Sequence, residues 1–185
     1  IIGPKKIKEN SRNGNSYNLQ PTKFKVITNS REIKELNVVS SGDFIIASPI
    51  NIGKLEINMA GSGNILLEKK VEGNKLEINL ASSGSVVASN IDLAGIECSL
   101  AGSGYIQIAG KADRAEYNLA ASGNIKAYEC VTGKTECNIA GSGNIQTHTR
   151  NQLEANIVGS GNVYYKGNPT TSKSIIGSGK LKSAN

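Results

Sequence analysis

The chain has no tryptophan, one methionine and one histidine, and aromatic residues make up only 4% of its 185 residues. Such a composition fits a thin, stacked fold better than a compact globule. No apolar run reaches the roughly 18 residues that a membrane-spanning helix needs. The small aromatic surface and the lack of a base-reading motif argue against nucleic-acid binding. What the sequence has in quantity is glycine, with 21 residues.

Excess charge is confined to one segment of the chain. The net charge is +6, and residues 1–34 hold eight basic residues against two acidic ones. Residues 35–185 are neutral, with 13 of each sign. We expect residues 1–32 to be a basic lead-in that caps the first turn of the repeat described below, because an uncapped end exposes strand edges. A basic segment also suits contact with an acidic glycan or a membrane surface, although a solvated face is the simpler interpretation.

A five-residue phrase, GSGNI at Gly61 to Ile65, returns whole or slightly altered until the end of the chain. Successive copies are 18 to 21 residues apart, which indicates a repeat protein whose units bury their apolar sides only by stacking. We therefore expect residues 33–185 to form one repeat domain of about seven to eight turns. Eight copies align on their last glycine, here called the motif glycine: Gly42, Gly63, Gly84, Gly104, Gly123, Gly143, Gly161 and Gly179.

Two columns of the repeat are apolar in every copy. Positions six and eight residues before the motif glycine are mostly apolar as well, and they share the parity of these columns. Apolar residues at every second position predict a half-buried strand in each turn, and hence an all-β fold. Four residues before the glycine stand Val38, Met59, Leu80, Leu100, Leu119, Ile139, Ile157 and Ile175, and two after it stand Phe44, Ile65, Val86, Ile106, Ile125, Ile145, Val163 and Leu181.

The positions between the apolar columns are polar and should face outward. Seven copies of the repeat carry a glutamate on this face. In four of them a lysine or arginine stands two residues before the glutamate, and in six an asparagine stands two residues after it. Exposed ion pairs contribute only about 0–1 kcal/mol each, so we expect the face to set solubility and register. The alternation also favours this structural role over binding of divalent cations. The glutamates are Glu35, Glu56, Glu77, Glu97, Glu116, Glu136 and Glu154.

The motif itself has the chemistry of a corner. Serine precedes the motif glycine in every copy, and asparagine follows it at Asn64, Asn124, Asn144 and Asn162. Glycine allows a positive φ or a tight approach, and a serine hydroxyl can bond nearby backbone. Asparagine tolerates left-handed backbone better than most residues. We expect each motif to turn the chain from one strand to the next.

The three cysteines, Cys98, Cys130 and Cys137, do not form a disulfide framework. Cys98 and Cys137 fall in one column with Tyr117 between them, so their Cα atoms should lie about 9–10 Å apart at ~4.8 Å per turn. A disulfide requires less than about 7 Å. We interpret the thiols as small buried or half-buried fillers rather than metal ligands or redox groups.

The stretch LEINMAGSGNI, Leu55 to Ile65, repeated from Leu76 and again from Thr135, resembles the bacterial family described as putative auto-transporter adhesin, head GIN domain. The likeness covers about residues 33–182. It implies a single-stranded right-handed parallel β-helix, or solenoid, similar to the pectin-lyase fold. It also implies a protein that is exported to the cell surface, outer membrane or periplasm and often tethered as a lipoprotein. For function, the resemblance implies cell-surface adhesion.

Both ends of the chain depart from the repeat. The chain starts at Ile1 rather than at methionine, which suggests a processed or trimmed chain and leaves open whether a signal or lipoprotein segment preceded it. In the last copy, Ser172 and Lys173 stand where a glutamate and an apolar residue are expected. We therefore expect the last turn to be frayed or partly capped.

Aromatic side chains outside the core are the candidate ligand contacts, because they can stack on sugar rings. They are Tyr105, Tyr128, Tyr164 and Tyr165. The alternative for Tyr164 and Tyr165 is that they cover the last turns. We expect a glycan or a surface protein as the partner, and no cofactor, metal or catalytic residue. Side-chain ladders or the variable connections between strands would make the contact.

Two other function classes stay open. A polysaccharide lyase or hydrolase would need clustered carboxylates that break the repeat, whereas Asp43, Asp92 and Asp113 fall at unrelated offsets. The single histidine, His148, has no serine or cysteine constellation around it. A structural or assembly protein would bind no ligand and would self-associate through an open end of the solenoid.

Overall fold

A computed structural model describes residues 33–39 and 41–184 of the chain, so the predicted basic cap at residues 1–32 lies outside the described residues. The described residues form β-strands and no helix, and the strands belong to one twelve-stranded sheet. The strands are β1 (Glu35–Val38), β2 (Phe44–Ile46), β3 (Ile50–Met59), β4 (Asn64–Leu67), β5 (Val71–Leu80), β6 (Ser85–Leu100), β7 (Tyr105–Leu119), β8 (Asn124–Gly141), β9 (Asn144–Gly159), β10 (Asn162–Lys166), β11 (Thr170–Gly177) and β12 (Lys180–Ser183).

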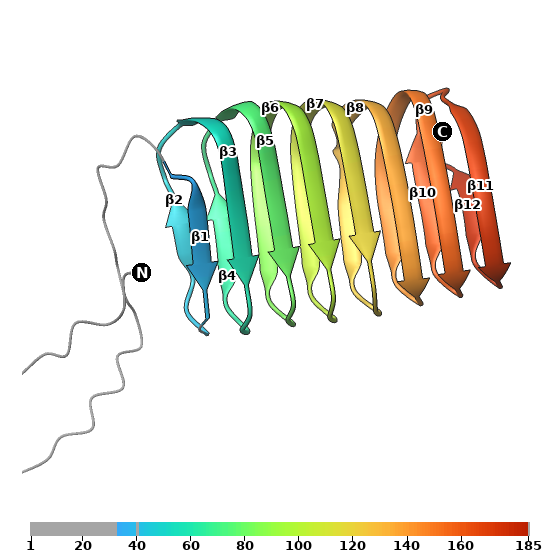
Figure 1. The fold of residues 1–185 in the computed structure, drawn as a ribbon, viewed down its shortest axis with the longest axis horizontal. Helices are drawn as coiled ribbons and strands as arrows, with labels where there is room; N and C mark the ends of the chain where they lie inside the picture. Colours follow the sequence, from blue (N-terminus) through green and yellow to red (C-terminus); the bar gives the residue numbers. More distant parts are fainter. Residues whose placement is uncertain (1–32, 40, 185) are drawn as a thin grey trace, which may run out of the picture.

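The strands stack into two layers that run along the long axis of the molecule (Figure 1). The front layer consists of β1, β3 and β5, the C-terminal halves of β6 to β9, and β11. The rear layer consists of β2 and β4, the N-terminal halves of β6 to β9, and then β10 and β12. Each strand pairs in parallel with its equivalent one turn away. The predicted all-β parallel solenoid is therefore confirmed, with about seven turns.

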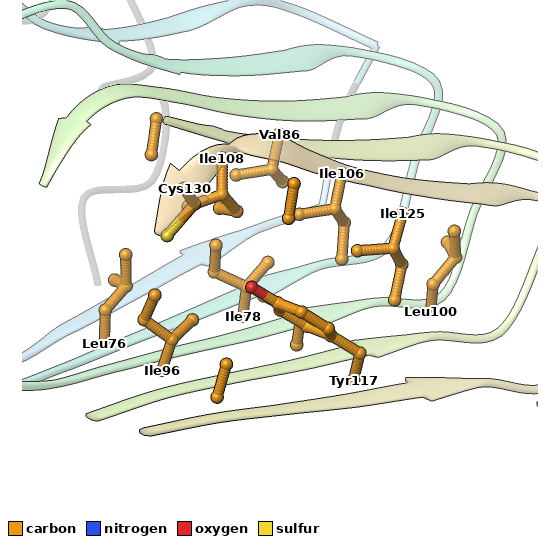
Figure 2. Close-up of a cluster of buried hydrophobic side chains, with 14 of the residues drawn as sticks. Leu76, Ile78, Val86, Ile96, Leu100, Ile106, Ile108, Tyr117, Ile125 and Cys130 are labelled. Atoms are coloured by element: carbon orange, nitrogen blue, oxygen red, sulfur yellow. The ribbon is translucent and has the colours of Figure 1, made fainter. Parts of the chain in front are cut away.

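The register of the strands follows the columns read from the sequence. In the front layer Leu80 pairs with Leu100, and Leu100 pairs with Leu119. In the rear layer the column two residues after the motif glycine is continuous in the same way. Side chains of the two layers point toward one another, with Val86 and Ile106 facing Ile78 and Tyr117 across the interior (Figure 2). These side chains are fully buried, and burial of each of the three aliphatic ones contributes about 1.5–3 kcal/mol of transfer free energy.

The interior becomes polar near the C-terminal end of the solenoid. Thr132, Thr135, Thr147 and Thr149 are all buried. Their hydroxyl oxygens lie 2.6 Å apart between Thr132 and Thr135, 2.7 Å between Thr135 and Thr149, and 3.2 Å between Thr147 and Thr149. The Thr132 hydroxyl also donates to the backbone carbonyl of His148 at 3.0 Å. Because each hydroxyl has a partner, hydrogen bonds within the interior offset the cost of removing the cluster from water.

The motif glycines are required by close packing between turns. A Cβ added to any of them from Gly63 onward would lie 2.0 to 2.5 Å from the carbonyl oxygen of the motif glycine one turn back. Non-glycine residues in the described part all have negative φ, so the expected left-handed asparagines are wrong. Instead the asparagine side chains bond along the stack, with the Asn162 amide donating to Asn144 at 3.1 Å and Asn144 donating to Asn124 at 3.3 Å. The asparagines thus serve the stack through hydrogen bonds between their side-chain amides, and not through a left-handed backbone conformation.

The cysteines and the last turn complete the fold. Cys98, Cys130 and Cys137 are buried free thiols, as predicted.

The last turn is not frayed, because β11 pairs with β9 over all eight of its residues and β12 pairs with β10. The side chain of Lys173 occupies the inward column of this turn and remains exposed. A charged residue at that place on an edge strand is a partial cap.

Candidate functional site

Three of the four predicted tyrosines share the outer face of the rear layer. Tyr105 begins β7, Tyr128 lies in β8 and Tyr164 lies in β10. Each is exposed or half-buried, and neighbouring residues such as Ile106, Ala127 and Val163 face the core. Tyr165 takes one of those inward positions and packs against the core cluster. Tyr165 thus points inward near the last turns, whereas Tyr164 points outward.

A lysine lies over the ring of each outward tyrosine. The Nζ atom of Lys126 is 4.7 Å from the ring centroid of Tyr105, that of Lys166 is 4.8 Å from Tyr128, and that of Lys182 is 5.6 Å from Tyr164. These distances are typical of cation–π contacts, which contribute about 0.5–1 kcal/mol at exposed sites. We call the six residues the Tyr–Lys face.

The three lysines give the Tyr–Lys face a positive charge, whereas its tyrosine rings are uncharged. Lys166 also approaches Glu129 at 3.8 Å, the one carboxylate bonded to a lysine of this face among the described residues. Partial burial, with a smaller contribution from Tyr164, raises the pKa of Tyr128. Flat aromatic rings beside ammonium groups can stack on the apolar side of a sugar ring and pair with its acidic substituents.

The front layer carries the predicted polar columns on its outer face. Asparagine amides bond from turn to turn, at 2.9 Å between Asn79 and Asn58 and at 3.0 Å between Asn156 and Asn138. In the early turns lysines bridge the glutamates: Lys54 lies 3.0 Å from Glu77. The hydrogen bond from Lys54, with a smaller one from Asn79, lowers the pKa of Glu77. This part of the face is a closed ladder of ion pairs, as the sequence predicted.

A groove of about 750 Å³ opens on the front layer where this ladder stops. Gly95 takes the place of a cation between Lys75 and Arg114 in the register of the sheet. Arg114 and Lys134 line the groove, and neither forms an ion pair within the described part of the chain. Sequence reasoning missed this groove, although the replacement of a column cation by Gly95 was the available signal.

Residues with catalytic or metal-binding potential come from different turns. Asp43 accepts the side-chain amide of Asn64 at 2.8 Å, and Asp92 pairs with Lys111 at 3.1 Å. Asp113 lines the groove. His148 lies half-buried in β9, in register with Lys166 on the outer side of the rear layer. Across residues 33–39 and 41–184, no three His, Cys, Asp or Glu side chains are grouped so as to hold a metal ion.

In the same described segments, no helix is long and apolar enough to cross a membrane. A search of curated proteins finds no match to the sequence.

Solved structures share this fold and much of the sequence. A crystal structure from Parabacteroides distasonis described as a putative lipid binding protein is 52% identical, with a TM-score of 0.89 over 99% of this chain and 74% of that one. A putative adhesin from Parabacteroides merdae is 33% identical, with a TM-score of 0.77 over 82% of this chain and 64% of that one. A putative adhesin from Parabacteroides distasonis is 29% identical, with a TM-score of 0.75 over the same shares. This chain thus spans less than two thirds of the length of both adhesin structures.

A family model described as putative auto-transporter adhesin, head GIN domain matches residues 6–72 and 65–169. Together the two segments cover most of the chain, including all of the repeat up to the last turns. The chain belongs to the putative auto-transporter adhesin, head GIN domain family.

Proposed function

We propose that this chain is a non-enzymatic binding module, exported and held at the cell surface, which uses the Tyr–Lys face to bind an acidic glycan. The family's description as an adhesin supports a binding role at a surface. The observation that carries the choice of site is the gathering of three outward tyrosines, each with a lysine over its ring, on one side of the solenoid.

The strands hold this face ready for a ligand. Tyr105 and Tyr164 stand in register with polar residues of neighbouring turns, and the residues between them anchor the strands in the core. Rings fixed on a sheet lose little conformational freedom on binding, which lowers the entropic cost of association. Each lysine can exchange its contact with a ring for a carboxylate or sulfate of the ligand. Affinity should therefore fall as the salt concentration rises.

Glycan arrays followed by calorimetric titration test this proposal. We expect acidic glycans to bind the wild-type protein, and the triple variant Tyr105→Ala, Tyr128→Ala, Tyr164→Ala to bind at least about tenfold more weakly, since stacked aromatic groups contribute about 0.5–1.5 kcal/mol each. A matched control is Leu66→Ala with Val87→Ala, which truncates half-buried outward side chains of the same layer. Equal loss of affinity in the control, or none in the triple variant, would contradict the proposal.

Lipid binding is a second candidate function, because the first similar structure carries that description. Val158 and Ile176 are 54% and 68% exposed, and they are paired in register near the C-terminal end. The space between the layers is filled by buried side chains, so an acyl chain would bind at exposed apolar side chains such as this pair. Sedimentation with phospholipid vesicles tests the idea: binding that Val158→Ser and Ile176→Ser abolish would favour lipid over glycan.

An enzyme acting on polysaccharides is the remaining alternative, and the groove gives it a specific location. Glu116 and Glu136 lie in register one turn apart and both line the groove. We expect no release of reducing ends or unsaturated sugars when the protein is incubated with a broad set of polysaccharides. Turnover that Glu116→Gln removes would establish catalysis instead.

A further inference from the structure

One side chain is missing from a column of the front layer where the groove opens. From turn to turn this column reads Lys54, Lys75, Gly95, Arg114 and Lys134 in the register of the sheet. Gly95 therefore leaves a gap between two long cationic side chains. The hollow includes this gap and draws its lining from five successive turns, with that of Arg114 in the middle, about 19 Å along the axis at ~4.8 Å per turn.

Backbone geometry does not require a glycine at this position. A Cβ added to Gly95 would meet only the carbonyl oxygen of Asn74, at 3.9 Å, and its φ is not in the left-handed region. By contrast, a Cβ on Gly110 would lie 2.2 Å from the carbonyl oxygen of Ile91, and Gly110 has a φ of +127°. Ordinary van der Waals space is thus available for a side chain at Gly95, and its absence keeps the groove open.

The cationic side chains on the two sides of the gap differ in whether they form ion pairs. Before it, Lys75 lies 2.6 Å from Glu97 and 3.6 Å from Glu77. After it, Arg114 and Lys134 form no ion pair with any described residue. Glu116 accepts one side-chain bond, from Asn118 at 2.9 Å, and so retains acceptor capacity. The groove therefore presents donors and acceptors that the protein itself does not saturate.

We propose that this groove is a second binding site, which takes an extended, uncharged glycan chain laid along the solenoid axis. Five carboxylates and three cations line it, so a polyanion would be repelled. Sugar hydroxyls both donate and accept, and they match carboxylates that alternate with guanidinium, ammonium and amide groups. The site lies on the opposite layer from the Tyr–Lys face and differs from it in ligand charge.

A peptide is less suited to this groove than a glycan. Extended peptides bind sheets mainly by adding a strand to an open edge. The strand segments beneath the groove, in β5 to β9, are paired with neighbours along the stack. They therefore offer no free backbone row, and recognition must come from side chains alone.

Filling the gap tests the site. In the whole chain, Gly95→Lys restores the column cation and should reduce affinity for neutral oligosaccharides, chosen from a neutral glycan array, by at least about tenfold. The matched control is Gly53→Lys, because a Cβ there has nothing within 4 Å and Gly53 does not line the groove. We expect the control to keep wild-type affinity. Thermal unfolding should show that both variants remain folded.

Further variants separate this site from the Tyr–Lys face. Arg114→Ala should weaken binding of the neutral oligosaccharide, whereas the triple tyrosine variant should leave it unchanged. The reverse pattern should hold for an acidic glycan, so either site can fail alone. The proposal is overturned if no neutral glycan binds, if Gly95→Lys binds as well as the wild type, or if a peptide array gives the ligand that Gly95→Lys excludes.

Discussion

Tyr117 shows what a single inward side chain contributes to this fold. Its ring is completely buried between Cys98 and Cys137 in the column six residues before the motif glycine. Its hydroxyl has no hydrogen-bond partner of standard geometry, although the Cys130 thiol is close enough to interact with it. Burial thus stabilises the ring, while the hydroxyl loses its hydration without a full replacement.

Removing this hydroxyl should therefore stabilise the protein. We expect Tyr117→Phe to raise the free energy of unfolding by about 1 kcal/mol, since a buried unsatisfied polar group costs about 1–3 kcal/mol. Guanidinium unfolding followed by circular dichroism measures the change. A loss of stability would show that the hydroxyl makes a favourable bond to Cys130.

The thiols should make stability depend on alkaline pH. Burial raises the pKa of Cys130 to about 12, and it also raises the pKa values of Cys98 and Cys137. Thiols of the unfolded chain lose protons above about pH 8.5, so stability is full below that pH and falls above it by up to about 1.4 kcal/mol per pH unit for each thiol. Urea unfolding between pH 7.5 and 10 should show this decline. A flat profile, or the same slope after all three cysteines are changed to alanine, would contradict it.

At the scale of the element, the repeat predicts the stacking but not its fine contacts. The apolar columns could be read from the sequence because alternation and period are set by the strand geometry that every turn shares. The side-chain hydrogen bonds that link Asn124, Asn144 and Asn162 could not be read from the sequence. They depend on side chains that meet across turns and not on local backbone preference. The groove was not predicted for a similar reason: Gly95 contributes to it only because the register of the sheet places it beside Lys75.

The corner glycines should tolerate no side chain. In Gly143→Ala the new methyl group would lie 2.2 Å from the carbonyl oxygen of Gly123 and 2.7 Å from a methyl carbon of Leu119. Because real Cβ atoms do not approach so closely, adjacent turns must separate. We expect a loss of roughly 2–3 kcal/mol in the free energy of unfolding. Gly53→Ala is the control, with nothing within 4 Å of the added atom and a much smaller expected change.

An inward charge should be more damaging than a tight corner. Ile145 is completely buried in the rear layer. Ile145→Asp would place an unpaired carboxylate in the stack, at a cost of roughly 4 kcal/mol or more. Thermal unfolding checks this: a melting temperature equal to that of the wild type would mean that the column does not point inward.

The whole molecule is a stack of two layers (Figure 1), and the outer sides of these layers carry different side-chain chemistry. The rear layer presents the Tyr–Lys face, and the front layer presents ion pairs that give way to the groove. The sequence named the three tyrosines but could not show that they share a side, because Tyr128 lies within an irregular stretch of pairing between β7 and β8. Tyr165 was named with them, and only its parity in β10 places it against the core.

Amide chemical-shift mapping with an acidic glycan identified on the array tests the central claim most directly, because it locates the contact on the intact chain. The proposed function predicts shifts confined to the outer side of the rear layer, around Tyr105, Tyr128 and Tyr164 and the lysines beside them. Shifts centred on the front layer or on the pair Val158 and Ile176, or no shifts at ligand concentrations that saturate binding, would contradict it.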